Sequence, residues 1–417
     1  MQQFHTDRDV LPPAWLMDVS VLSVCNFCLG AVFAFPETFW SYTLVGNFTP
    51  TQVQLIYCGM YSPWIIKPLF ARIIDRGPLA CETYVQLLMP LSALVWLAIL
   101  LAHDLQVTIG MYVLDQMLIS FADVALDTIM VKRCKLEKDN RSVQSHVLIW
   151  RSVGMAVGAY TGGLAKSVFG DIAVYGGSIV LAILFCAMAC LLGDVRMSDE
   201  VDAPCPNIRA VWTPTLRMAL AFTFMVHIVP DIGGLFDFFL ISDLKFSPII
   251  LGSLDMIGYI ACIAGSLLYS QSFHGRSNVV IIQVALAIIA VETVLPVGLI
   301  FGWNTSMGIS TTHWAGLDGF FRAVPQRLLI MPINGAILEF CAKGHEGTVY
   351  AVFTALSNVA TIAATMLGAL FSHFLGLSKG NMYALWILFV VRGALFALLV
   401  PFARMLPSGK KAYTDAT

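Results

Sequence analysis

Ionisable side chains lie inside long apolar runs of this sequence. In a membrane such groups are costly unless they face one another or a water-filled cavity, and they often mark the path of a solute or an ion. In the first half of the chain they are Lys67, Asp115, Asp123, Asp127 and Arg151. In the second half they are Asp231, Asp255, Glu292, Asp318, Arg322, Arg327 and Arg392. A bundle that only held itself together would not need this inventory.

Helical spacing predicts which of the first-half groups meet. Asp123 and Asp127 are four residues apart and share one helical face. At about 1.5 Å per residue, Asp123 and Arg151 lie roughly 12 Å from the cytoplasmic ends of their helices, and Lys67 and Asp127 lie slightly nearer. We expect this cluster to line the floor of a cavity and to bind substrate, with Lys67 and Arg151 holding an anionic group and Asp123 and Asp127 also in the site. The alternative is an internal set of salt bridges that closes a cytoplasmic gate, and the two roles overlap.

Three further side chains, Trp64, Trp150 and Arg322, are candidates for substrate contact. Trp64 and Trp150 each lie within three residues of a cation of the cluster, and either could stack on a planar ligand, although packing is the commoner role of a tryptophan in a membrane helix. Asp318 and Arg322 are four residues apart near mid-membrane and are expected to neutralise each other. Arg327 faces another direction and is predicted at the gate.

Asp115 is the predicted proton carrier. It lies nearer mid-membrane than Asp123 and Asp127, and no first-half cation lies at its depth. We therefore expect Asp115 to take up a proton during transport. The competing interpretation is that it pairs across the cavity with Arg322 or Arg392, in which case it stabilises the fold.

The elements that must position these groups follow from composition. Of 417 residues, 58% are hydrophobic and only 12% are charged, against roughly 25% charged in soluble proteins. A helix that crosses a bilayer needs about 20 apolar residues, which leaves room for about twelve. The runs lie at about 15–39, 51–73, 83–102, 106–131, 143–169, 172–193, 214–240, 248–271, 279–302, 308–338, 348–374 and 383–403. A net charge of −2 gives no support for a nucleic-acid partner.

The distribution of basic residues predicts orientation. Lys and Arg concentrate in the loops that follow even-numbered predicted helices, above all at 132–141. Basic loops of membrane proteins face the cytoplasm, so both termini are expected there. We expect a multi-pass protein of the plasma membrane. The sequons at Asn47 and Asn304 then lie outside, where glycosylation occurs. The expected organisation is an N-terminal segment 1–14, a six-helix half 15–193, a linker 194–213, a second half 214–403 and a tail 404–417.

The two halves resemble each other in places. Phe48-Thr49-Pro50 opens one predicted helix and Phe246-Ser247-Pro248 opens its counterpart, with Tyr61 matching Tyr259 at the same offset. We therefore predict an all-α membrane protein with twelve transmembrane helices in two six-helix halves, the major facilitator architecture. Chemistry by the chain itself is not expected: Cys25 and Cys28 lack a second ligand pair for a metal, no cofactor motif occurs, and no enzyme signature is present.

The stretch from Ser62 to Leu69 (SPWIIKPL), followed by Asp75, resembles the folate–biopterin transporter family of the major facilitator superfamily. Further stretches agree in the same order: 121–127, Arg151 with its following glycines, 244–252, and 346–370. The resemblance implies uptake of folates or pterins coupled to protons. It also implies that the pterin stacks on Trp64 or Trp150 and that Arg151 and Lys67 hold the glutamate tail.

One turn departs from the family pattern. The family usually has a basic Gly-Tyr-Arg-Arg-like turn after the helix 2 Asp, whereas this chain has Arg76-Gly77-Pro78 there. We expect Asp75, Arg76 and Arg327 to form the gate. Within transport, the alternative substrate is another small organic anion. From another functional class, the chain could be a receptor or scaffold that kept the fold without transporting. The expected partners are a small solute, protons and the lipid bilayer, and the sequence indicates no oligomeric state.

Overall fold

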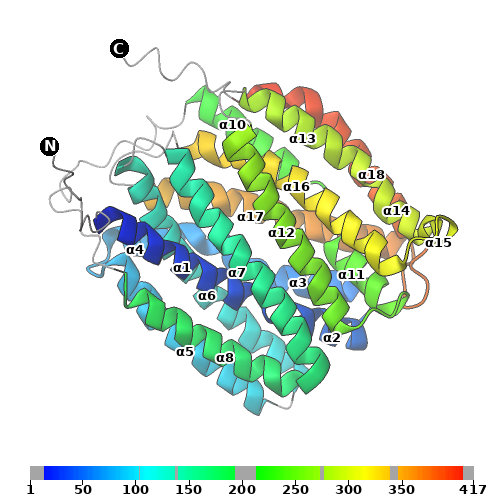
Figure 1. Cartoon of the computed structure of the whole chain (residues 1–417), viewed down its shortest axis with the longest axis horizontal. Coiled ribbons are helices and arrows are strands. Elements are labelled where there is room, and N and C mark those ends of the chain that lie inside the picture. Colours follow the sequence, from blue (N-terminus) through cyan, green and yellow to red (C-terminus); the bar gives the residue numbers. More distant parts are fainter. Residues whose placement is uncertain are drawn as a thin grey trace, which may run out of the picture.

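The computed structural model of the chain describes residues 14–102, 104–136, 140–192, 213–272, 277–338 and 346–406. The described chain is helical, with a single isolated bridge between Ser378 and Asn381. The helices run side by side as one bundle (Figure 1). The predicted linker and the two terminal segments lie almost wholly outside the described residues.

The first half forms six helical spans. Two spans are broken: α1 (Ala14–Ala34) continues as α2 (Glu37–Asn47), and α3 (Pro50–Tyr61) continues through the 3-10 turn η1 (Ser62–Ile66) into α4 (Lys67–Arg76). The others are α5 (Cys81–Leu101), α6 (Leu105–Leu136), α7 (Asn140–Phe169) and α8 (Asp171–Ala189).

The second half also forms six helical spans, of which the first and the third are broken. Its first span is α10 (Pro214–His227) with α11 (Gly233–Ser242), and its third is α13 (Asn278–Glu292) with α14 (Val294–Ile300). The others are α12 (Pro248–Ser272), α16 (Thr311–Leu338), α17 (Glu346–Phe374) and α18 (Leu385–Leu399), which ends in η2 (Val400–Met405). A short helix α15 (Trp303–Ser306) lies between α14 and α16.

Every predicted span is therefore helical. In the described chain, eight spans are long and apolar enough by themselves to cross a membrane. The other four predicted spans, 51–73, 143–169, 214–240 and 308–338, correspond to helices over 50–76, 140–169, 214–242 and 311–338. Two of these are broken into shorter helices, and α7 and α16 carry several charged or polar side chains. They are less apolar because they carry polar groups into the bundle.

Proline explains two of the breaks between helices. Pro230 ends α10, because its ring cannot continue a helical hydrogen-bond ladder, and Pro63 lies in η1. By contrast, α16 runs through both Pro325 and Pro332.

The two halves are in close backbone contact where α7 packs against α12. A Cβ at Gly163 would lie 2.6 Å from the Pro248 carbonyl oxygen, and one at Gly252 would lie 2.5 Å from the Ala159 carbonyl oxygen. Side chains at these positions would force the helices apart, since real Cβ atoms do not approach so closely. The paired glycines therefore let backbone meet backbone between the halves.

Candidate functional site

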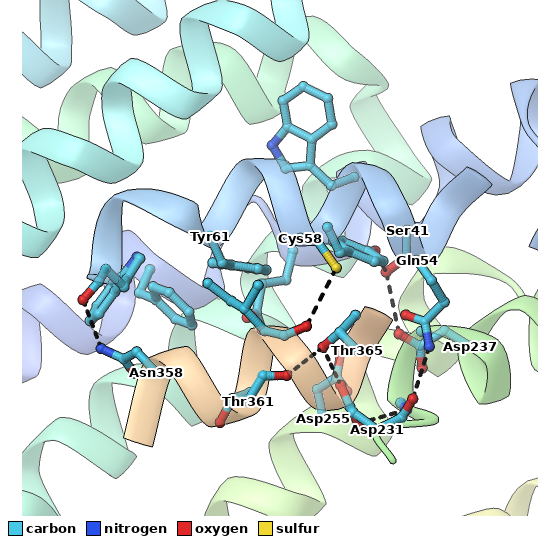
Figure 2. Close-up of a pocket in the computed structure, with 18 residues that line it drawn as sticks. Ser41, Gln54, Cys58, Tyr61, Asp231, Asp237, Asp255, Asn358, Thr361 and Thr365 are labelled. Atoms are coloured by element: carbon cyan, nitrogen blue, oxygen red, sulfur yellow. Dashed lines mark hydrogen bonds between the residues drawn. The ribbon is translucent and has the colours of Figure 1, made fainter. Parts of the chain in front are cut away.

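A cavity of about 490 Å³ lies between the two halves. Residues of α1, α2, α3 and η1 form its first-half wall, and the segment before α11, α11 itself, α12 and α17 supply the opposite wall (Figure 2). Its volume falls in the range of pockets that bind small molecules, roughly 300–1,000 Å³.

Aromatic side chains form much of the first-half wall. They are Phe33, Trp40, Tyr57, Tyr61 and Trp64. The rings of Tyr57 and Tyr61 stack with centroids 6.2 Å apart and planes 18° apart, because the two residues are one helical turn apart on α3. Phe33 packs against Tyr61 and meets the edge of Trp64 at 5.7 Å. These rings make a broad surface on which a planar solute can stack.

The start of α3 fixes the direction of this wall. Thr49 and Gln52 form a reciprocal capping box, in which each side chain bonds the backbone of the other, and Pro50 occupies the first helical turn. Capping satisfies backbone groups that would otherwise lack partners at the helix end.

The described residues that line the cavity include acidic side chains but no basic ones. The acidic residues are Glu37, Asp231, Asp237 and Asp255. Two are hydrogen-bonded across the interface between halves: Tyr259 donates to Glu37 at 3.0 Å and Ser41 donates to Asp237 at 3.4 Å. Asp255 makes no hydrogen bond with any described residue. The cavity therefore carries more negative than positive groups.

Asp231 is held at the break between α10 and α11. Its side chain accepts hydrogen bonds from the Gly233 amide at 3.1 Å and from Thr365 at 3.3 Å, and lies 3.9 Å from Arg392. Its backbone carbonyl accepts a hydrogen bond from Gln54 at 3.1 Å (Figure 2). A broken helix thus supplies polar groups to the cavity at mid-bundle, as in many transporters.

Other hydrogen bonds join the halves around the cavity. Asn358 on α17 donates to the Trp64 carbonyl at 3.0 Å, and Thr51 on α3 bonds Ser372 at 3.3 Å (the first is drawn in Figure 2). Arg327 on α16 donates to Ser152 on α7 at 2.8 Å. These are individual polar contacts that can break while the halves stay folded.

The predicted charge cluster forms, but away from the cavity. Lys67 lies 2.5 Å from Asp123, whose other oxygen lies 2.9 Å from Arg151. Arg151 also reaches Asp127 at 3.2 Å. Asn26 completes the cluster, since its oxygen accepts from Arg151 at 2.8 Å, and sequence reasoning had no signal for it. This arrangement matches the salt-bridge alternative more closely than an open anion site.

Trp64 is the boundary between the cluster and the cavity. Its ring lines the cavity, its indole N–H donates to Gln116 at 3.0 Å, and the Lys67 ammonium lies 4.6 Å from the ring centroid. Of the residues predicted to bind substrate, Trp64 lines the cavity, whereas Lys67, Asp123, Asp127 and Arg151 do not.

The remaining predicted residues are dispersed. Trp150 is 38% exposed on the outside of the bundle, where its indole donates to His146. Arg322 lies 5.9 Å from the Phe236 ring and interacts electrostatically with Asp318, but the two form no ion pair within 4 Å in the described chain. Asp75 and Arg76 end α4.

Asp115 also lies outside the cavity. It is fully buried between α5 and α6, where it accepts hydrogen bonds from Ser92 at 2.5 Å and Trp96 at 3.0 Å. Both partners belong to the same half, and among the described residues Asp115 forms no ion pair with Arg322 or Arg392, the pairing that the competing interpretation required. Its role as a proton carrier stays a prediction.

Two cavity carboxylates were missed by the sequence reasoning. Glu37 follows Pro36 within the first apolar run, and Asp237 lies in the apolar helix α11. The rule that singled out Asp255, an ionisable residue inside an apolar run, applies equally to both. The repeat signal did locate Tyr61 and Tyr259, which lie on or next to the cavity in opposite halves.

The profile of the BT1 family matches residues 35–416. The chain belongs to the BT1 family. Among similar proteins, a folate-biopterin transporter of Synechocystis is 25% identical over 85% of this chain and 74% of the relative. Probable folate-biopterin transporter 5 of Arabidopsis thaliana is 23% identical over 95% and 84%, respectively. Folate transporter 1 of Plasmodium falciparum is 21% identical over 80% and 68%.

Solved structures identify the fold of this BT1 chain. A D-xylose-proton symporter superposes with a TM-score of 0.71 at 10% identity, over 95% of this chain and 99% of that one. The nucleoside transporter NupG gives 0.67 at 12% identity, over 94% and 99%. The chain therefore has the major facilitator fold of an integral, multi-pass membrane transporter, and the predicted fold class is confirmed. It belongs to a transporter family and not to an enzyme family.

Proposed function

We propose that this BT1 chain is a secondary active transporter that takes up folate or a pterin by alternating access, coupled to protons. The observation that carries the proposal is the cavity between the halves, with an aromatic wall on one side and carboxylates around it. A pterin is flat and bears N–H donors on one edge, so stacking and carboxylate acceptors suit it.

The packing of the halves supports alternating access. The glycine contact of Gly163 with Gly252 is close and apolar, whereas around the cavity the halves are joined by individual hydrogen bonds and by the packing of α17 against α3 and η1. Rocking about the α7–α12 contact would cost few of the buried apolar contacts within each half. Breaking the polar links on one side at a time would open the cavity to that side.

Proton coupling is proposed at the cavity carboxylates. Glu37 and Asp237 each hold a hydrogen bond that crosses between halves, from Tyr259 and Ser41 respectively. Adding a proton to either carboxyl group removes its charge and alters that bond, so proton binding and the movement of the halves are linked. The charges that face these groups are Asp231, Asp255 and Arg322.

We also propose a plasma-membrane location with both termini in the cytoplasm, and the basic loop at 132–141 supports this orientation. Of the two sequons, Asn47 is the better acceptor for glycosylation because it is exposed at the end of α2. Asn304 is 2% exposed, and its amide donates to the Ile309 carbonyl and to Thr311.

Uptake into vesicles tests the proposal. Purified protein in liposomes should accumulate labelled pterin or folate above its outside concentration when an inward proton gradient is imposed. A protonophore should abolish the excess, and protein-free liposomes are the control. A receptor or scaffold would bind the solute without ever accumulating it, and that result would overturn the proposal.

A further inference from the structure

We propose that the cavity selects pterins without a glutamate tail over folates. We also propose that the Asp255 carboxylate accepts hydrogen bonds from the pterin's amino edge, which consists of the amino group and the adjacent ring N–H. This inference rests on the proposed function and narrows its substrate class. It follows from three features: the sign of the charges lining the cavity, the occupation of the nearby cations, and the free hydrogen-bonding capacity of Asp255.

The lining of the cavity is unfavourable for an anionic tail. Its charged groups are the carboxylates Glu37, Asp231, Asp237 and Asp255. A folate brings two further carboxylates in its glutamate tail. Anions taken out of water need cations or several donors in return, and the described lining offers no cation.

The cluster cations of the first half are already paired. Lys67 is committed to Asp123, and Arg151 is committed to Asp123, Asp127 and Asn26. Only 5% of the Lys67 side chain is exposed, and the Trp64 ring covers it on the cavity side. A glutamate tail would have to break this cluster to reach either cation.

The cations of the second half are outnumbered by acids. Arg322 interacts electrostatically with Asp318, Glu292, Asp237 and Asp255, and Arg392 lies 3.9 Å from Asp231. Two guanidinium groups therefore face five carboxylates and cannot offset the charge of all of them. They do not provide a free anion site.

A pterin without the tail meets the same groups favourably. Its pyrimidine ring carries an amino group beside a ring N–H, so two donors point the same way. A carboxylate has two oxygens that can accept both at once, and such charge-assisted pairs are strong and orientation-specific. The flat bicycle can meanwhile stack on the rings of Tyr57 and Tyr61.

Asp255 differs from the other lining acids because neither of its oxygens accepts a hydrogen bond from a described residue. Tyr259 occupies Glu37, Ser41 occupies Asp237, and both Gly233 and Thr365 occupy Asp231. Asp255 lines the cavity from α12 (Figure 2) and accepts no hydrogen bond from any described residue. Glu37 and Asp237 each accept on one oxygen only, whereas both oxygens of Asp255 are free of donors from the described residues. Asp255 is thus the lining carboxylate that can accept two ligand donors at once without displacing a protein donor.

Competition for uptake tests the tail preference. With labelled biopterin as the transported probe, unlabelled biopterin should inhibit at a concentration at least about tenfold lower than folate, the loss that one unpaired charged group produces. Equal or better inhibition by folate, with biopterin uptake intact, overturns the tail preference but leaves transport standing. Absence of uptake for every pterin and folate would instead overturn the proposed function itself.

An edge-matched pair of ligands tests Asp255. Lumazine has a carbonyl where a pterin has the 2-amino group, so its edge offers one donor between two acceptors. Wild type should prefer pterin over lumazine by roughly tenfold or more, and Asp255→Asn should narrow or invert that ratio, because an amide offers one donor and one acceptor. The ratio does not depend on the amount of folded protein.

Asp171→Asn is the matched control. Asp171 pairs with Lys166 at the surface, outside the cavity, so this change should leave the ratio as in wild type. An unchanged pterin-to-lumazine ratio in Asp255→Asn would overturn the assignment of Asp255.

Discussion

The charge cluster of the first half and the acid-lined cavity between the halves both bury ionisable groups, but they differ in balance. In the cluster, two cations meet two carboxylates at 2.5–3.2 Å, and each charge has a partner. In the cavity, four carboxylates line the wall without a lining cation in the described chain. Balanced groups fix a structure, whereas unbalanced groups beside an open volume are available to a solute or a proton.

Removing one member of the balanced cluster should have the largest effect. Arg151→Ala leaves Asp123 and Asp127 to share Lys67, and breaking a buried pair typically costs about 3–5 kcal/mol. We expect poor expression and a strongly lowered unfolding temperature, with uptake lost as a consequence. Fluorescence-detected size exclusion and thermal unfolding in detergent measure this.

The control for that change is Lys166→Ala, which opens a pair at the surface and should barely alter stability. A stable, well-expressed Arg151→Ala protein that has lost uptake would show that the cluster binds substrate, and the contrast between the two regions would break down.

Removing a proton site from the unbalanced region should come next. Glu37→Gln keeps the shape of the side chain and a hydrogen bond to Tyr259, but it cannot exchange a proton. We expect pterin exchange between loaded vesicles to persist, while accumulation driven by a pH gradient disappears. Accumulation that still follows the pH gradient in Glu37→Gln would assign the coupling to another group.

Asp115→Asn should have a smaller effect, on stability. Its carboxylate accepts from Ser92 and Trp96, and the amide can keep only part of this arrangement. We expect a loss of roughly 1–3 kcal/mol in the free energy of unfolding, the range for a buried group left without a partner, with unchanged pH dependence of uptake. Loss of pH dependence in a stable Asp115→Asn protein would instead support the proton-carrier prediction from the sequence.

Trp150→Phe should have the smallest effect. The indole of Trp150 is exposed and bonds only His146 in the described chain, so uptake should stay within about twofold of wild type, a change below roughly 0.5 kcal/mol. Trp64→Phe is the matched comparison inside the cavity and should weaken pterin uptake. Equal loss in both variants would contradict the assignment of the cavity as the substrate site.

Much of the fold could be predicted from the sequence because apolar runs of bilayer length have few alternatives. Proline alone does not predict where such a run is broken, since α10 ends before Pro230 whereas α16 continues through Pro325 and Pro332. Element type and approximate length are local properties, and local patterns report them.

The site was harder to predict because residue counting gives the depth of a side chain in the membrane but not the direction in which it points. Residue counting placed Lys67, Asp123 and Arg151 at similar heights, and the structure brings them together. Counting could not say that they face the interior of one half instead of the space between halves. That depends on how each helix is rotated against its neighbours, which is set by packing such as the glycine contacts of α7.

The central claim is that solute binds in the acid-lined cavity and not at the balanced cluster. A structure of the purified protein saturated with biopterin tests this most directly. The account predicts the pterin ring against Tyr57 and Tyr61, with its amino edge on Asp255 and the contacts of Lys67 and Arg151 with Asp123 intact. A pterin bound against Arg151, with those ion pairs opened, would contradict it.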